Sequence, residues 1–131
     1  MSDRFFKRSD IFWRATTSNE HKDKTFVLIK DVKGDIVSAG VTRRIMAYCD
    51  SMMCATNDFN EGAVGSVHSH PHIQITYVAE GRFRFTVGDE IKEVNKGDTL
   101  YIKGGVMHGC VCLKKGVLAD FFAPMREDFL K

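Results

Sequence analysis

Histidine spacing is the feature of the chain with the clearest chemistry. His68 and His70 are two residues apart, and side chains at i and i+2 of a β-strand point to the same face. We therefore expect both imidazoles to converge on one metal ion. Gln74 has the same parity, although Pro71 is expected to bend the chain between them. His108 belongs to a later strand and is expected to complete the site from across a barrel.

An isolated His-x-His pair also has a plainer interpretation, namely two half-buried strand histidines that bond backbone groups. A site with three imidazoles suits Ni, Co, Fe, Mn or Zn and is too rich in nitrogen for Mg or Ca. His72 follows Pro71 and is favoured as a non-ligand, either a hydrogen-bond partner of a ligand or a surface residue. His21 lies in a charged segment and is given no role.

Asp120 is an acidic residue inside the apolar run Leu118-Ala119-Asp120-Phe121-Phe122. Burial of a carboxyl group is costly unless the group is paired, hydrogen-bonded or protonated. A structural interpretation is that Asp120 caps a turn or pairs with Arg126. Cys110 and Cys112 share strand parity with His108; they are possible soft ligands, but small apolar core residues are the preferred interpretation.

Short apolar runs separated by glycine-containing turns predict the elements that position these residues. The chain has 131 residues, 44% of them hydrophobic and 27% charged, as expected for one globular domain. Runs rich in Val, Ile, Phe, Thr and Tyr predict an all-β sandwich or barrel. The expected strands lie near 42–48, 52–59, 73–79, 82–87, 91–95, 99–102, 107–112 and 117–123. Residues 26–29 are a further possible strand, and the tail 125–131 is expected to form a helical turn.

Charge and cysteine usage indicate the surroundings of the protein. Nineteen basic and seventeen acidic residues give a net charge of +2 with no basic cluster, so neither a nucleic acid nor a membrane is expected as a partner. The N-terminus lacks the apolar core of a signal peptide, and the four cysteines are expected to be reduced thiols in the cytoplasm.

The first forty residues differ from the rest of the chain. We expect residues 1–40 to be an extension and residues 41–131 to form the barrel. Phe5, Phe6, Phe12 and Trp13 are too many large apolar groups for a solvated tail. The extension is therefore expected to pack on the barrel or on a partner subunit, and a homodimer that exchanges N-terminal strands is the hypothesis that follows.

Glycines frame the histidines at regular spacings. The first stretch runs from Gly62 through His68, His70 and Gln74 to Gly81, and the second contains Gly97, Lys103, Gly105, His108 and Cys112. This frame resembles the two motifs of the cupin superfamily, with Gln74 for the usual Glu, Lys103 for Pro and Cys112 for Asn. The resemblance implies a single-domain double-stranded β-helix, or jelly-roll barrel, with one divalent metal on His68, His70, Gln74 and His108. A carboxamide in place of a carboxylate leaves the full +2 charge on the metal.

A narrower resemblance covers residues 41–131. His68-Ser69-His70-Pro71-His72 with Gln74, Arg44-Ile45-Met46-Ala47-Tyr48 and the ending from Pro124 to Leu130 resemble the small pectin-degradation cupins of the KdgF type. That family converts 4,5-unsaturated uronates to linear 4-deoxy-5-keto uronates. The resemblance implies that Asp120 is the acid/base, that Phe122 packs at the sugar and that Arg126 recognises the substrate, as a bidentate partner for its carboxylate or hydroxyls.

Two other functions remain open at this point. A cupin dioxygenase would use the same ligands with iron to bind O₂. A non-catalytic sugar-binding cupin, for example the sensing part of a regulator, is the second alternative, although the first forty residues contain no recognisable helix-turn-helix.

Overall fold

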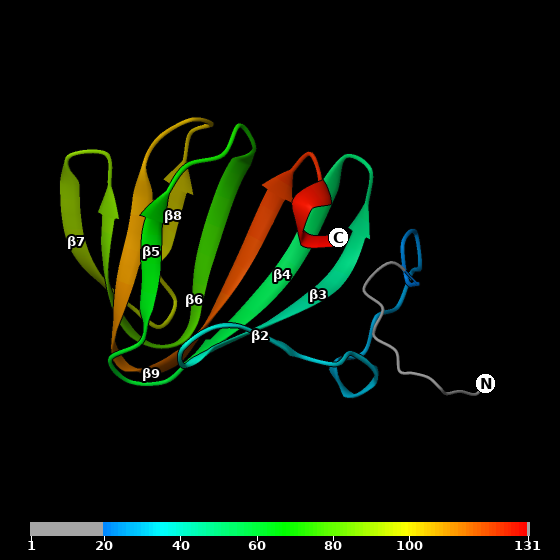
Figure 1. The fold of residues 1–131 in the computed structure, drawn as a ribbon, viewed down its shortest axis with the longest axis horizontal. Helices are drawn as coiled ribbons and strands as arrows, with labels where there is room; N and C mark the ends of the chain where they lie inside the picture. The colour runs from blue at the N-terminus through cyan, green and yellow to red at the C-terminus, as the bar shows by residue number, and fades with distance from the viewer. Residues whose placement is uncertain (1–19, 131) are drawn as a thin grey trace.

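The computed structural model describes residues 20–130, which form one antiparallel β-sheet curved into a barrel (Figure 1). The all-β expectation is confirmed, and the only helical elements of this range are two short 3-10 turns. In chain order the elements are η1 (Ile29–Asp31), β2 (Asp35–Ser38), β3 (Val41–Cys49), β4 (Met52–Phe59), β5 (Val64–His68), β6 (Ile73–Val87), β7 (Glu90–Asn95), β8 (Thr99–Ile102), β9 (His108–Ala123) and η2 (Glu127–Leu130).

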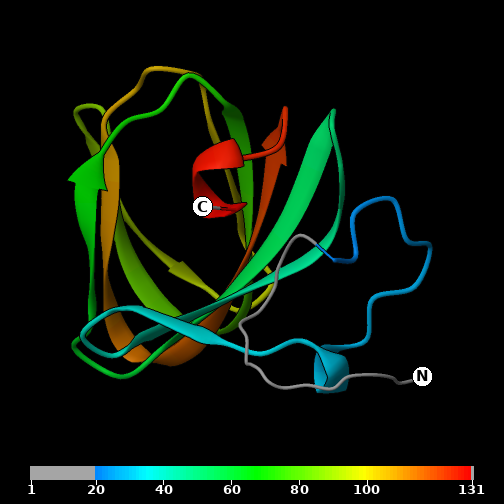
Figure 2. The same cartoon turned by 45° about the vertical axis from the view of Figure 1, so that its right-hand side comes forward.

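Two long strands, β6 and β9, connect the two walls of the barrel. The sheet order is β2-β3-β4-β9-β6-β7, with β5 paired to β9 and β8 paired to β6. The first half of β9 pairs with β5 and its second half with β4, while β6 pairs with β8 through its first half and with β7 through its second. Figure 2 shows the strands curving around an interior, with the C-terminal turn between the two walls.

Glycines let the long strands bend without interrupting their hydrogen bonds. The sequence predicts breaks near residues 80–81 and 113–116, but β6 and β9 continue through both, with register shifts between Val78 and Phe83. Gly81 has a φ of +85°, and a Cβ there would lie 2.5 Å from the carbonyl oxygen of Lys114. Because only glycine permits this conformation and this close approach, expected turns become bulges inside continuous strands.

The remaining elements agree only in part with the expectations from the sequence. Residues 26–29 do not form a strand; the chain there is irregular and ends in the 3-10 turn η1. The strands β2 and β5 are not expected from the sequence because both are short and exposed and lack an apolar alternation. The expected helical turn near the C-terminus is present as η2.

The barrel interior is filled from alternate strand positions. On β6, the side chains of Gln74, Thr76 and Val78 are buried, while those of the intervening residues are exposed. One apolar cluster lies in the barrel interior and contains Val41, Phe59, Val78, Phe83, Phe85, Cys110, Cys112 and Leu118. The preferred interpretation of Cys110 and Cys112 as core residues is therefore confirmed. A second cluster of Ile45, Tyr48 and Met53 packs under the C-terminal turn.

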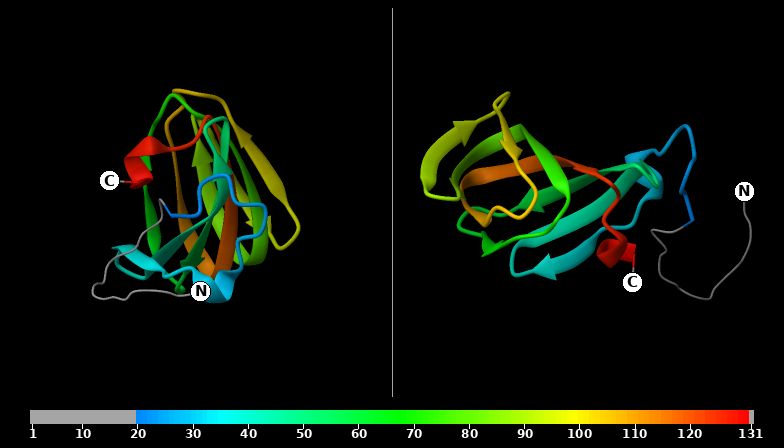
Figure 3. Two further views of the ribbon diagram at one scale, coloured as in Figure 1. Left: turned by 90° about the vertical axis from the view of Figure 1, so that its right-hand side faces the viewer. Right: turned by 90° about the horizontal axis from the view of Figure 1, so that it is seen from above.

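The described part of the extension docks on β3. The Nε2 atom of His21 lies 3.0 Å from the carbonyl oxygen of Ile45, and its ring meets the Tyr48 ring edge-on. Lys22 forms an ion pair with Asp50 at 2.5 Å. Figure 3 shows residues 20–34 beside the barrel, past β3. His21, which has no role predicted from the sequence, thus helps to attach the extension.

Several predictions about the N-terminal part stay predictions. Phe5, Phe6, Phe12 and Trp13 lie outside the described residues, and so does the proposed exchange of N-terminal strands. The division at residue 40 is also untested, although β2 already pairs with β3 from Asp35. Within residues 20–130, there is no helix with the length and apolar character needed to span a bilayer.

Candidate metal centre

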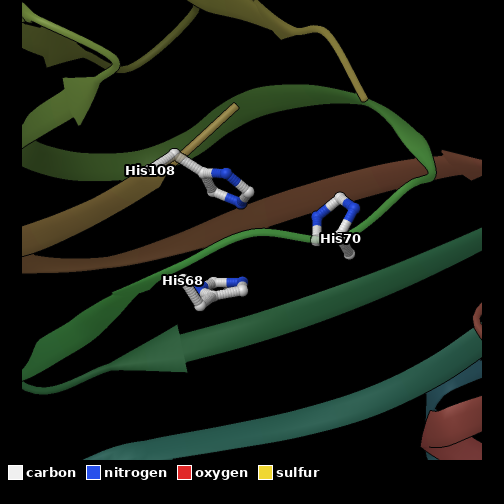
Figure 4. A group of neighbouring side chains, drawn as sticks. All are labelled: His68, His70 and His108. Atoms are coloured by element: carbon white, nitrogen blue, oxygen red, sulfur yellow. The ribbon is translucent and has the colours of Figure 1, made fainter. Parts of the chain in front are cut away.

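Three histidines from separate segments meet at one end of the barrel (Figure 4). One ring nitrogen each from His68, His70 and His108 lies within 4.8 Å of the others. His68 ends β5 and His108 begins β9, where the two residues are direct cross-strand partners. His108 therefore approaches from the adjacent strand and not from across the barrel. His70 lies in the loop after β5, so the i, i+2 strand geometry expected for the pair is not what brings these rings together.

Backbone carbonyls orient all three imidazoles in the same way. The Nδ1 atom of His68 lies 2.7 Å from the oxygen of Ser66, and that of His108 lies 2.9 Å from the oxygen of Val106. The Nδ1 atom of His70 lies 3.1 Å from the oxygen of His72. A carbonyl only accepts hydrogen bonds, so we infer that each Nδ1 carries the proton and that each Nε2 offers a lone pair. This tautomer leaves the three Nε2 atoms free to bind a metal ion.

Burial favours the neutral form of these rings. Desolvation lowers the pKa of His70 and of His108, and the neighbouring charge of Arg126 acts in the same direction. Neutral imidazole is the form that binds metal. His70 and His108 therefore combine a suitable orientation with an environment that favours the neutral ring.

Gln74 places its side-chain oxygen against the cluster. Its Oε1 atom lies 2.9 Å from Nε2 of His70, and its Nε2 atom donates to the hydroxyl of Thr76 at 2.9 Å. Neutral His70 has one proton, and with that proton on Nδ1 its Nε2 and the Gln74 oxygen are two acceptors facing each other. A cation bound by both atoms removes this repulsion, so the donor set fits a metal with His68, His70, His108 and Gln74 around it.

Asp120 is buried at the same end of the barrel and is held by three side chains. Thr76 donates to Oδ1 at 2.5 Å, Gln74 donates to Oδ1 at 3.3 Å, and Asn57 donates to Oδ2 at 2.8 Å. Desolvation raises the pKa of Asp120 to about 6, although the three hydrogen bonds and the charge of Arg126 oppose the shift. No ion pair joins Asp120 to Arg126 among the described residues, so their pairing is not the structural role of this carboxyl group.

Arg126 lies beside two aromatic rings and pairs with an acidic neighbour. Its Nε and Nη2 atoms donate to the two carboxylate oxygens of Asp128 at 3.0 and 2.8 Å. Its Cζ atom lies 5.0 Å from the ring centroid of Phe122 and 4.2 Å from that of Phe129. Phe122 in turn meets the ring of His70 at 5.6 Å. The bidentate edge of Arg126 is thus already used within the chain, and its Nη1 side is left for a ligand.

One cavity of about 460 Å³ connects most of these residues. Six of the seven expected site residues line it, namely His68, Gln74, His108, Asp120, Phe122 and Arg126. His70 instead lines a neighbouring cavity of about 580 Å³ that it shares with Arg126 and the C-terminal turn. The structure therefore brings all seven residues to one end of the barrel. This volume suits a ligand the size of a monosaccharide.

Two polar residues of the site are not found by sequence reasoning. Thr76 and Asn57 hold Asp120, and Thr76 is its direct cross-strand partner. Strand parity places Thr76 on the same face as Gln74, a signal that is present in the sequence. Asn57 has no such signal because its contact with Asp120 depends on the register between β4 and β9.

Comparison with known proteins agrees with the geometry. Residues 57–119 match the family model described as the cupin domain. The crystal structure of an RmlC-like cupin from Shewanella frigidimarina NCIMB 400 superposes with a TM-score of 0.78 at 35% identity, over 81% of this chain and 96% of that chain. A jelly-roll barrel with a histidine cluster at one end is the arrangement that defines a cupin.

Two relatives show to which family of cupins the chain belongs. The pectin degradation protein KdgF of Dickeya dadantii (strain 3937) is 40% identical over 93 residues, which cover 70% of this chain and 84% of that protein. The structure of KdgF from Halomonas sp. superposes with a TM-score of 0.78 at 32% identity, over 81% of this chain and 98% of that chain. The chain belongs to the KdgF family of cupins, which supports an enzyme of pectin degradation.

Proposed function

We propose that the protein opens 4,5-unsaturated uronates, the products of pectin or alginate lyases, into linear 4-deoxy-5-keto uronates. The observation that carries this proposal is the buried Asp120 carboxyl group, held by three donors in the cavity that His68 and His108 also line. The 40% identity to a pectin degradation protein supports a substrate derived from pectin. Small acidic sugars are thus the expected partners.

The metal is proposed to be one of Ni, Co, Fe, Mn or Zn, held by His68, His70, Gln74 and His108. When bound, it supplies a Lewis acid for the oxygen atoms of the substrate. The chain contributes the orientation of its ligands, because carbonyl oxygens hold the three Nδ1 atoms and Thr76 accepts from the Gln74 amide. The carboxamide of Gln74 adds no negative charge to this set.

Asp120 is proposed to move the protons of the reaction. Opening of the ring requires a proton on C4 of the double bond and the oxygen of water on C5, which produces a hemiketal. The bond between C5 and the ring oxygen then breaks, the proton of the C5 hydroxyl passes to the ring oxygen, and C5 becomes the ketone. A protonated Asp120 delivers the first proton and recovers one from the attacking water. Phe122 is proposed to pack against the sugar ring, and Arg126 to contact the substrate through Nη1.

The test uses unsaturated monouronate made by a lyase, with the ultraviolet absorbance of its conjugated double bond as the signal. We expect the protein to remove this absorbance, chelator to abolish the effect, and a divalent metal to restore it. Loss of absorbance that chelator leaves untouched would contradict the role of the metal. Oxygen uptake with another substrate, and no loss of absorbance, would support a dioxygenase instead.

We also propose that the protein is a homodimer that acts in the cytoplasm. Exposed apolar side chains cover the outer side of β6 and its neighbours; these residues, the outer apolar face, are Ile73, Ile75, Tyr77, Tyr101 and Phe121. A strand that is apolar on both sides is typical of one buried on both sides, which supports a second subunit there. All four cysteines are unpaired, which fits a reducing compartment.

A further inference from the structure

Arg43 is a cation in the wall of the cavity, and its side chain forms no ion pair within the described part of the chain, although Asp35 of β2 is its cross-strand neighbour. It lies on β3 directly opposite Asn57 of β4, and it lines the same cavity as His68 and Asp120. Its Cζ atom lies 3.6 Å from the ring centroid of Phe129, a cation–π contact that fixes the guanidinium. Across residues 20–130, the side chain of Arg43 takes part in no hydrogen bond or ion pair.

The charged groups around Arg43 are of both signs. Burial and then the charge of Arg126 lower the pKa of Arg43. The charges of Asp128, Asp35 and Asp120 raise that pKa without forming an ion pair with the guanidinium. Asp128 uses both oxygens on Arg126, and the carboxylate of Asp120 is occupied by Asn57, Thr76 and Gln74. Two guanidinium groups therefore share the ring of Phe129, and of the two only Arg126 forms an ion pair with a carboxylate of residues 20–130.

The half-buried guanidinium of Arg43 has N–H groups that donate to no acceptor among the described residues. It has five N–H donors in a planar fork that matches a carboxylate, and such a pair forms two parallel charge-assisted hydrogen bonds. Arg126 cannot offer the corresponding Nε–Nη2 edge because Asp128 occupies it. Arg43 is thus the arginine of the cavity wall whose bidentate edge is free for an anionic ligand.

We propose that Arg43 binds the carboxylate of the substrate and makes the site select acidic sugars over neutral ones. This inference rests on the proposed function, which supplies the acidic sugar. Arg43 is a specificity-determining residue in this scheme, since the proton transfer remains with Asp120. Substitution of Arg43 should raise KM much more than it lowers kcat.

The experiment compares Arg43→Gln and Arg43→Lys with the unchanged protein and with Arg44→Gln. Arg44 is the matched control because it is the next residue of β3 and pairs with Asp58 at 2.9 Å, outside the cavity. Turnover of unsaturated monouronate gives kcat and KM for each protein. Galacturonate and galactose differ only at C6, which is a carboxylate in the first and a hydroxymethyl group in the second. Calorimetric titration with each sugar gives a binding affinity that does not depend on turnover.

We expect Arg43→Gln to raise KM about ten- to hundredfold with kcat nearly unchanged, the size expected for a lost charge-assisted pair. Arg43→Lys should recover part of this loss, and Arg44→Gln should behave like the unchanged protein. Arg43→Gln should also remove the preference for galacturonate over galactose. An unchanged KM and preference, or equal weakening of both sugars, would overturn the inference.

Different results would contradict the proposed function and the proposed role of Arg43. If the unchanged protein leaves unsaturated monouronate intact, the proposed function is wrong, and the two sugar titrations still decide the role of Arg43. If turnover is present but Arg43→Gln preserves both KM and the preference for galacturonate, the function stands and the role of Arg43 is wrong. Melting temperatures of the three variants show whether a loss of binding arises from loss of the fold.

Discussion

The carboxyl group of Asp120 accepts three hydrogen bonds and lies within reach of a ligand in the cavity. We predict that Asp120→Asn retains its metal and loses about 10²- to 10⁴-fold in turnover, the usual contribution of a general acid/base. Asparagine has nearly the same shape but cannot deliver a proton. Metal content by elemental analysis and the rate of absorbance loss would check this, and full activity with full metal content would remove Asp120 from the mechanism.

The four thiols differ in environment, and their reactivity should differ accordingly. Burial raises the pKa of Cys110 to about 12, while hydrogen bonds from Ser51 lower the pKa of Cys49. The thiolate is the reactive form, so at pH 8 only about 10⁻⁴ of Cys110 is reactive. We predict that iodoacetamide labels Cys49 first, faster as pH rises, and labels Cys110 only after denaturation.

Mass spectrometry of peptides from protein labelled for increasing times measures this order directly. Cys49→Ser is the control and should remove the fast phase. Rapid labelling of Cys110 in the native protein would mean that the barrel interior is open to reagents.

The bend of β6 depends on the absence of a side chain at Gly81. Its φ of +85° is matched by the φ of +93° at Gly97, but a Cβ at Gly97 would meet nothing within 4 Å, whereas one at Gly81 would meet the β9 backbone at 2.5 to 2.6 Å. Gly97→Ala should therefore cost only the conformational penalty, about 1–2 kcal/mol.

Gly81→Ala should cost that penalty and a backbone clash, and we predict a loss of more than about 3 kcal/mol in the free energy of unfolding, in the range that follows severe overpacking. Urea unfolding of the two variants measures the difference. Equal losses would show that β9 moves aside easily and that the close approach of the two long strands is not a constraint on the barrel.

The way β6 and β9 each join both walls also determines which residues meet. Gln74 near the start of β6 lies beside Phe122 near the end of β9, whereas Val87 at the end of β6 lies beside His108 at the start of β9. Because both strands bend at their bulges, the two walls close on one cavity. Without the bends, the histidines and Asp120 would lie far apart along a flat sheet.

Assembly of the molecule is expected to bury the outer apolar face. Ile75 lies at its centre, paired with Tyr101 of β8 and with Phe121 of β9. We predict a solution mass of about twice the 14.8 kDa of the chain, and a shift toward the monomer in Ile75→Lys, because a buried unpaired charge opposes association.

Light scattering after size exclusion measures both masses. Ile91→Lys is the control because Ile91 is also exposed but lies on β7, away from this face. A monomer before any substitution would contradict the dimer, and an unchanged dimer in Ile75→Lys would place the contact elsewhere, for instance in the N-terminal extension.

Local spacing in the sequence was enough to predict the β-barrel and the gathering of His68, His70 and His108. The spacings from Gly62 to His68 and from Gly105 to His108 are short stretches of sequence, so they do not depend on how the strands pack. The alternation on the strands likewise predicts which side chains face inward. These features depend only on residues close together along the chain.

Only the tertiary structure decided how the charged groups are partnered. Thr76 and Asn57 hold Asp120, Asp128 takes the bidentate edge of Arg126, and the Arg43 side chain is left without an ion pair in the described range. The contacts to Asp120 depend on register between strands that are distant in sequence, and the position of Arg43 depends on where the C-terminal turn packs Phe129. A shift of register by one residue would reverse the face of every side chain involved, and no local pattern specifies that choice.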